Sequence, residues 1–333
     1  MSVGYRLVQW NRHKRVYDAI AIGAVAIYVG VFVGGGLLLL RGDRAVSAPI
    51  LAMRALGTCA IVLLHIVLCI GPLARISPLF APLLYNRRHL GVLTFLVALL
   101  HATLAIGFYG AFGERNPIAA VVNPARSAPP YEAFGFGALL ILFVMAATSH
   151  DFWLKNLSPR VWKAIHLAVI GAYALVVMHV AWGALQSEAS PVYTILLLAG
   201  AATVCGLHLF AGWRETLRDL RGVRPIDGWI DAGPADAVTE GRAAVVTVHN
   251  GERIALVRHE GRLCAMSNVC AHQGGPLGEG RVIDGCLTCP WHGYQYGPCS
   301  GGSPPPFTER VPTHRVRIEN GRAKIEAAEG GEP

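Results

Sequence analysis

Charged residues are scarce in the first 212 residues of this 333-residue chain, which hold only 15 Lys and Arg and 6 Asp and Glu. Long apolar runs take their place, each close to the ~20 residues that a helix needs to cross a hydrocarbon core of ~30 Å. The runs are 17–40, 51–72, 89–112, 133–149, 161–185 and 191–212. We therefore expect an all-α membrane bundle of about six transmembrane helices, of which 133–149 is the shortest.

Acidic residues do not balance the basic ones in this part, which has a formal charge of +9, whereas the rest of the chain has −1, for a total of +8. The cations flank apolar runs, which favours lipid headgroups as partners and argues against nucleic acid. Fourteen Lys and Arg fall on one side of the expected membrane and five on the other. This bias predicts a multi-pass protein of the bacterial inner membrane, with both termini in the cytoplasm. No cleavable signal is apparent, because the first run is long enough to be an anchor.

A dinucleotide-binding fingerprint is also missing, since no Gly-x-Gly-x-x-Gly follows a predicted strand. This absence argues against direct binding of NAD(P)H. The eight cysteines do not look like a disulfide framework. Those inside apolar runs are expected to behave as small hydrophobes, namely Cys59, Cys69 and Cys205. Three others are expected to be packing thiols, namely Cys264, Cys286 and Cys299.

Beyond a basic linker at 213–222, residues 223–328 have the short alternating runs of an all-β domain, followed by a tail at 329–333. The expected strands are 243–249, 253–258, 262–267, 313–319 and 322–326. Hairpin turns are predicted at Asn250-Gly251, Glu260-Gly261 and Asn320-Gly321.

Two loops of this domain each offer one thiol and one imidazole. Cys270-Ala-His272 is followed, after sixteen residues, by Cys289-Pro-Trp-His292. In one type of 2Fe–2S cluster, one iron takes two Cys and the other takes two His. Zinc is the main alternative, but zinc modules usually pair Cys with Cys and His with His. The mixed loops favour the cluster, with Cys270, His272, Cys289 and His292 as its ligands.

These motifs resemble a ferredoxin-type Rieske domain over residues 223–327. The Rieske proteins of quinol-oxidising complexes add a disulfide between the cluster loops, but Gly275 and Trp291 stand at those positions here. In high-potential members a Ser and a Tyr donate hydrogen bonds to cluster sulfur; here Tyr294 replaces the Ser, so that donor is missing, while Tyr296 can supply the second one. The resemblance therefore implies a potential in the lower half of the Rieske range of about −150 to +300 mV.

Histidines recur in or beside the apolar runs, namely His65, His101, His150, His166, His179 and His208. Ionisable groups in a bilayer are usually functional, and imidazole is a common axial haem ligand. At 1.5 Å per residue, His101 and His179 lie about 20 and 24 Å from the inner boundary. They could hold an outer haem b, and His65 with His166 an inner one, for which His150 or His208 could replace His65.

One geometric difficulty is that His166 and His179 lie about 140° apart around an ideal helix. Either Gly171 permits a bend or the two haems lie on different sides of that helix. Residues 50–185 resemble the ferric reductase-like transmembrane domain, particularly the haem-binding subunit of the methionine sulfoxide reductase system. The matching stretches are Arg87-Arg88-His89-Leu90-Gly91 and Trp162-Lys-Ala-Ile-His166-Leu, with His101 and His179. The resemblance implies b-type haem, one or two per chain.

Taken together, these features favour transmembrane electron transfer through a Rieske 2Fe–2S cluster and b-type haem. The expected donor is a cytoplasmic flavin or NAD(P)H reductase or a ferredoxin, and the expected acceptor is an extracytoplasmic redox protein or small molecule. The chain would then be an electron-transfer component of an oxidoreductase system. A Rieske oxygenase is disfavoured because no large soluble domain offers a mononuclear iron site. The alternative is a membrane-anchored redox sensor without haem electron transfer.

Overall fold

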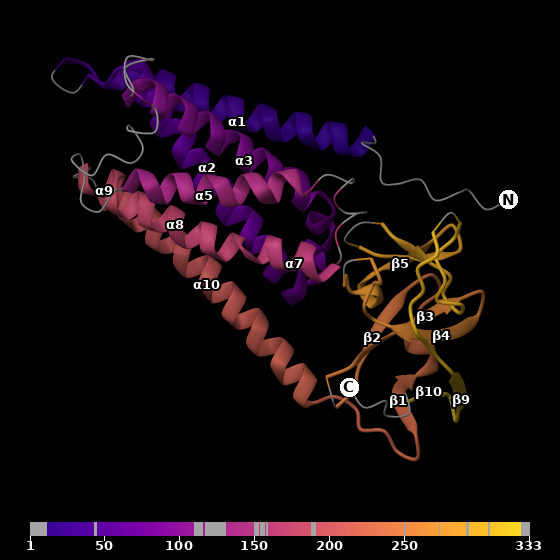
Figure 1. Cartoon of the computed structure of the whole chain (residues 1–333). Coiled ribbons are helices and arrows are strands. Elements are labelled where there is room, and N and C mark those ends of the chain that lie inside the picture. The colour runs from indigo at the N-terminus through magenta and orange to yellow at the C-terminus, as the bar shows by residue number, and fades with distance from the viewer. Residues whose placement is uncertain are drawn as a thin grey trace. The chain divides into compact units, whose positions relative to one another are not determined.

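The computed structural model (Figure 1) describes residues 12–42, 45–109, 116, 131–149, 153, 157, 159–187, 191–249, 251–272, 274–290, 293–305 and 307–327. The chain forms two compact units, one ending at His208 and the other beginning at Leu209. This division lies close to the composition change at residue 212.

The first unit is helical. Its elements are α1 (Arg12–Leu39), α2 (Ala48–Ile76), the 3₁₀ turn η2 (Pro78–Phe80), α3 (Ala81–Tyr109), α5 (Tyr131–Ala147), α7 (Pro159–Leu167), α8 (Val169–Trp182), α9 (Ala184–Ser187) and the first part of α10 (Pro191–Leu220), which continues into the second unit. Within the described residues, five helical segments are long and apolar enough to cross a membrane, and the 17-residue α5 is a shorter apolar helix. The expected membrane bundle is therefore confirmed, with five full-length spans and one short one.

The helices of this unit share one interior. α2 packs along α1 and α3, while α5 packs along α8 and α3. Their common core gathers apolar residues from α2, α3, α5, α8 and α10, namely Leu64, Phe95, Leu142, Ala172, Tyr173 and Val204. Large apolar side chains on the outer faces stay exposed, for example Ile27 at 69% and Leu198 at 63%. Exposed apolar faces around a packed interior are what a lipid-facing bundle requires.

The expected helix 161–185 is interrupted at Ala168, which joins α7 to α8. The backbone N–H of Ala168 donates to the carbonyl of Ile165 at 3.2 Å, three residues back, and the regular four-residue pattern resumes when Ala172 donates to Ala168. The interruption lies three residues before Gly171, the position expected to permit it. His166 and His179 therefore belong to different helices, and the angle calculated for one ideal helix does not apply.

The second unit contains the all-β domain. Its strands are β1 (Trp229–Pro234), β2 (Ala243–Thr247), β3 (Arg253–His259), β4 (Arg262–Ser267), β5 (Arg281–Ile283), β6 (Cys286–Thr288), β7 (Gln295–Tyr296), β8 (Thr313–His314), β9 (Val316–Glu319) and β10 (Arg322–Glu326). They form three antiparallel sheets in the orders β1-β10-β9, β2-β3-β4-β8 and β5-β6-β7.

Tight hairpin turns set the register of these strands. Glu260 and Gly261 both have positive φ, 51° and 72°, between β3 and β4. Asn320 and Gly321 repeat this conformation, at 51° and 73°, between β9 and β10. Two residues with positive φ are the signature of the type I′ turn, so both predicted hairpins are confirmed. The third predicted turn includes Asn250, which lies outside the described residues.

The start of the second unit is helical. The expected linker at 213–222 is mostly the end of α10, which continues to Leu220. Arg253 of β3 pairs with Glu215 and Asp219 on this last part of α10, each at 2.7 Å. These ion pairs attach the end of the helix to the β domain.

Candidate metal centres

The two predicted cluster loops have the same pattern of backbone hydrogen bonds. In the first, the N–H of Cys270 donates to the carbonyl of Gly275, and the carbonyl of Cys270 accepts from Gly274. In the second, the N–H of Cys289 donates to the carbonyl of Tyr294, and its carbonyl accepts from Gly293. The glycine four residues after each Cys has positive φ, 72° and 73°. Each loop therefore closes on its own cysteine through the same two hydrogen bonds.

Both cysteines of these loops are buried. Cys270 and Cys289 are each 2% exposed and share a core with Met266, Leu287 and Tyr296. The hydroxyl of Tyr296 lies 3.2 Å from the Cys270 sulfur. Burial, followed by the charge of Cys270 as a thiolate, raises the pKa of Tyr296, so its phenol stays protonated. The phenol expected near a ligand sulfur therefore lies within hydrogen-bond distance of one.

His272 lies beside the other tyrosine of the motif. Its ring stacks on that of Tyr294, with centroids 4.3 Å apart and planes 8° apart. The Tyr294 hydroxyl donates to a carboxylate oxygen of Glu309 at 2.9 Å. Tyr294 thus directs its hydroxyl to a carboxylate and its ring face to an expected ligand. His292, the fourth expected ligand, lies outside the described residues.

The described part of this site fits a 2Fe–2S cluster. It brings together two buried sulfurs, an imidazole two residues after one of them and a phenol directed at sulfur. Buried thiolates and hydrogen bonds to sulfur are the features that hold iron–sulfur clusters and tune them.

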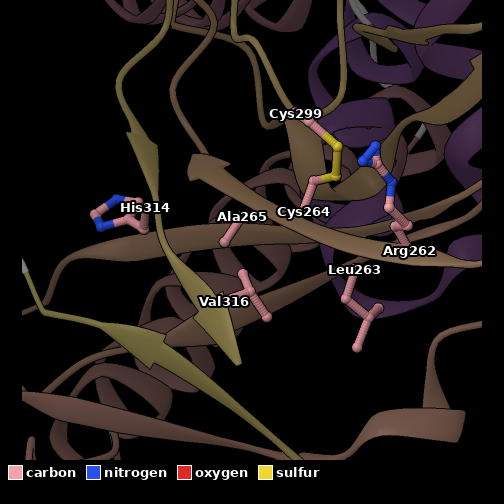
Figure 2. Close-up of a pocket in the computed structure, with 7 residues that line it drawn as sticks. All are labelled: Arg262, Leu263, Cys264, Ala265, Cys299, His314 and Val316. Carbon is pink, nitrogen blue, oxygen red and sulfur yellow. A yellow bond between two sulfur atoms is a disulfide. The ribbon is translucent and has the colours of Figure 1, made fainter. Parts of the chain in front are cut away.

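Two cysteines expected to be packing thiols are instead bonded to each other. Cys264 and Cys299 form a disulfide between residues 35 apart in the sequence, with a Cα–Cα distance of 5.0 Å. Figure 2 shows this bond at the wall of a pocket. The expectation was wrong because β4 and the turn after β7 become neighbours only when the sheets assemble. Cys286 remains a free thiol, and burial raises its pKa.

In the helical unit, His101 of α3 and His179 of α8 are brought together. Their ring centroids lie 6.2 Å apart, and the ring planes make an angle of 76°. The Nδ1 of His101 donates to the carbonyl of Met53 at 2.9 Å, and the Nδ1 of His179 donates to that of Tyr131 at 2.8 Å. Because a carbonyl can only accept, both hydrogens are on Nδ1, which leaves both Nε2 lone pairs for a metal.

The spacing of this pair fits a metal ion held from both sides. Metal–imidazole bonds are about 2.0–2.1 Å, so two of them plus the half-widths of two rings give centroids about 6 Å apart. The observed 6.2 Å matches this value. With both Nδ1 atoms held by backbone carbonyls, His101 and His179 are residues that would hold a haem iron through Nε2.

Glycines on neighbouring helices leave room for the histidine rings. A Cβ at Gly57 would lie 3.0 Å from the His101 ring, and one at Gly135 would lie 2.7 Å from Nδ1 of His179. A Cβ at Gly200 would be similarly close to the ring of His65. These glycines were not among the residues predicted from the sequence, although an isolated glycine within an apolar helix is a recognisable sign of close packing.

His65 and His166, the second expected pair, have other neighbours. The Nε2 of His65 hydrogen-bonds the hydroxyl of Tyr173 at 2.9 Å. His166 stacks on Trp162 with centroids 3.7 Å apart, and its Nε2 lies 3.4 Å from the Ser149 hydroxyl. Among the ring contacts between described residues, none joins His65 to His166.

Of the two histidines named as substitutes for His65, only His208 lies within the described residues. His208 donates from Nδ1 to the carbonyl of Val204 in its own helix, at 2.9 Å. His150 lies outside the described residues.

Comparison with known proteins matches each unit separately. Residues 228–315 match the Rieske [2Fe-2S] domain family, and residues 56–177 match the ferric reductase like transmembrane component family. The ferredoxin component of the naphthalene 1,2-dioxygenase system of Pseudomonas putida is 32% identical over 99 residues, which are 29% of this chain and 94% of that protein.

A second relative matches the helical part. The protein-methionine-sulfoxide reductase heme-binding subunit MsrQ of Ralstonia nicotianae is 27% identical over 176 residues, 52% of this chain and 76% of that protein. Among solved structures, the ferredoxin of Sphingomonas yanoikuyae B1 covers 29% of this chain and 96% of its own, with 22% identity and a TM-score of 0.27.

Motifs, fold and comparisons agree on both parts of the molecule. The β domain has the two loops and the family match of a Rieske domain. The helical unit has the apolar spans and the family match of a ferric reductase-like component. The chain is therefore a multi-pass membrane protein that belongs to the Rieske [2Fe-2S] family and joins this domain to a ferric reductase-like transmembrane domain.

Proposed function

We propose that this protein transfers electrons across a membrane, between a cytoplasmic donor and an extracytoplasmic acceptor. The observation that carries the proposal is the pair His101 and His179, whose Nδ1 atoms are fixed by backbone carbonyls and whose rings are 6.2 Å apart. This pair lies in the interior of a membrane bundle that is continuous in sequence with a Rieske domain. One chain with sites for two one-electron centres supports a role as an electron conduit, that is, a protein that carries electrons from one side of the membrane to the other.

In the Rieske domain, we infer that Cys270 and Cys289 hold one iron, and that His272 and His292 hold the other. The cluster supplies a one-electron couple when bound. Tyr296 donates a hydrogen bond toward the Cys270 sulfur, which favours the more negative reduced state. Tyr294, anchored on Glu309, fixes the ring plane of His272.

In the helical unit, His101 and His179 would be the axial ligands of a b-type haem. MsrQ, a relative of this part, is named as a heme-binding subunit. The carbonyls of Met53 and Tyr131 orient the two imidazoles, and Gly57 and Gly135 leave space beside them. A second haem at His65 and His166 remains a prediction. It would require His65 to release the Tyr173 hydroxyl and His166 to release that of Ser149.

The direction of the chain in the membrane follows from its charges. The fourteen-to-five bias of Lys and Arg supports a cytoplasmic location for both termini and, with them, for the Rieske domain. A flavin or NAD(P)H reductase or a ferredoxin would then meet the cluster, and a redox protein or small acceptor would meet the opposite end. A fusion of alkaline phosphatase after Pro333 should be inactive, and an active fusion would overturn this topology.

The optical spectrum of the purified, dithionite-reduced protein tests the proposal most directly. The expected spectrum shows the absorption of b-type haem. EPR spectroscopy of the same reduced sample should show the signal of a Rieske cluster. A protein with the Rieske signal but no haem would contradict the conduit and support the alternative, a membrane-anchored redox sensor.

A further inference from the structure

The disulfide between Cys264 and Cys299 is not accounted for by electron transfer through cluster and haem. It joins β4 to the turn that follows β7. Its two halves differ in accessibility, because Cys264 is 7% exposed whereas Cys299 is exposed. The disulfide therefore joins an exposed residue, which an external thiol can approach, to a buried one.

The bond also lines an open pocket of about 180 Å³ (Figure 2). Arg262, His314 and Val316 line the same pocket, and the guanidinium of Arg262 is turned toward the disulfide. A nearby cation favours the thiolate over the thiol, and the thiolate is the reactive form in exchange. The pocket thus combines access for a thiol with a charge that stabilises the sulfur it would release.

The backbone around the disulfide is held by other bonds as well. In the turn that carries Cys299, Gly301 donates to Gly297, Gly297 donates to Gly302 and Val311 donates to Gly301, at 2.8 to 2.9 Å. On the other side, Cys264 lies within β4, which pairs with β3 along its whole length. The bond can therefore open and close without unfolding the strands that it joins.

The disulfide is also close in sequence to the cluster environment. Met266, two residues after Cys264, packs in the same core as Cys270 and Cys289. Tyr296, three residues before Cys299, hydrogen-bonds the Cys270 sulfur. Each half of the disulfide therefore lies within three residues of a side chain that packs around the cluster cysteines.

We propose that Cys264 and Cys299 form a redox-active disulfide that exchanges with a cytoplasmic dithiol, as a second redox site of the Rieske domain. The assignment to the cytoplasm rests on the proposed topology. In that compartment disulfides are usually transient and catalytic or redox-sensing. The assignment of the exchange site itself depends only on the exposure of Cys299, the pocket beside the disulfide and the backbone hydrogen bonds around it.

The exchange balances without a further reactant. A thiolate of the dithiol attacks the Cys299 sulfur, forms a mixed disulfide and releases Cys264 as a thiolate, which takes a proton. The second thiol of the dithiol then loses its proton and attacks the mixed disulfide, releasing Cys299 as a thiol. The dithiol loses two electrons and two protons, and the protein gains the same two electrons and two protons.

The first test uses the full chain in detergent, with dithiothreitol as the dithiol and no denaturant. After reduction of the folded protein, dithiothreitol is removed, and only then is the protein unfolded, alkylated with iodoacetamide and mapped by mass spectrometry. We expect Cys264 and Cys299 to be modified together while the Rieske EPR signal is retained. A bond that opens only after denaturant is added would overturn the proposal, because it would then be a structural crosslink.

A second test uses single variants exposed to glutathione disulfide. Cys264→Ala should form an adduct at the accessible Cys299, whereas Cys299→Ala should leave the buried Cys264 unmodified. Cys286→Ala, which removes a free thiol outside the pair, should behave as wild type. Equal modification of Cys264 and Cys299 would contradict the assigned order of attack. A phosphatase fusion that reports the opposite topology would remove the cytoplasmic partner but leave the exchange in place.

Discussion

The two expected metal centres are built in opposite ways. In the Rieske domain each ligand loop closes on its own cysteine, through hydrogen bonds to residues four and five positions later. In the helical unit His101 and His179 are far apart in the sequence, and carbonyls of two further helices, Met53 in α2 and Tyr131 in α5, fix their rings. The Rieske centre can therefore be recognised from a local sequence motif, whereas the histidine pair in the helical unit depends on how the helices pack.

This difference predicts that the two centres can be removed independently. His101→Ala or His179→Ala should abolish haem binding at that site while the Rieske EPR signal remains. Conversely, Cys270→Ser should abolish the Rieske signal and leave haem content unchanged in a pyridine haemochrome assay. If either histidine variant keeps its full haem content, the proposed axial pair is wrong.

The contribution of packing can be tested at the glycines. Gly135→Ala would place a Cβ 2.7 Å from Nδ1 of His179, and should lower haem occupancy several-fold. Overpacking of this kind costs about 1–3 kcal/mol. Gly137→Ala is the matched control on the same helix, because its Cβ would meet Leu175 at an ordinary 3.4 Å. Equal haem occupancy in both variants would show that close approach of the helices does not position His179.

In the Rieske domain the finer adjustment should come from hydrogen bonds to sulfur. Tyr296→Phe removes the hydroxyl that lies 3.2 Å from the Cys270 sulfur. The reduced cluster is more negative, so this bond stabilises it more than the oxidised one. A loss of about 1 kcal/mol in that difference lowers a one-electron potential by about 40 mV.

Redox-titrated EPR of the full chain measures this shift. Tyr294→Phe is the control, because the Tyr294 hydroxyl bonds Glu309 and not a sulfur, so its effect should be smaller. An unchanged or higher potential in Tyr296→Phe would remove the assigned role of Tyr296. The wild-type midpoint itself should fall in the lower half of the Rieske range, and a value near +300 mV would revive quinol as the donor.

The smallest effect is expected where α10 meets the β domain. Arg253→Met removes the ion pairs with Glu215 and Asp219, whose side chains are partly exposed. Pairs of this exposure are worth up to about 1 kcal/mol, so the domain should melt a few degrees lower. Arg315→Met is the control, since its pair with Glu326 has an arginine side chain that is 84% exposed. Identical melting of both variants in a thermal scan would show that the junction adds no stability.

Much of the fold could be predicted because its signals are local. Apolar runs set the helices, and dipeptides such as Glu260-Gly261 and Asn320-Gly321 set two hairpins through their left-handed backbone. A bend near Gly171 was one of two possibilities that the sequence offered, but its place at Ala168 was not predicted, since no proline or glycine occupies that position. The β5-β6-β7 sheet was missed because its strands are only two or three residues long.

The sequence by itself determined the two-part organisation, the membrane spans and the Rieske motif, because hydropathy and ligand spacing act over short stretches of chain. Only the tertiary structure decided which side chains pair with one another around the two expected metal centres. It brought Cys264 within bonding distance of Cys299, directed the Tyr294 hydroxyl to Glu309 and placed His65 against Tyr173 rather than His166. The physical reason is that such pairings depend on the relative placement of strands and helices, which the packing of the whole core sets.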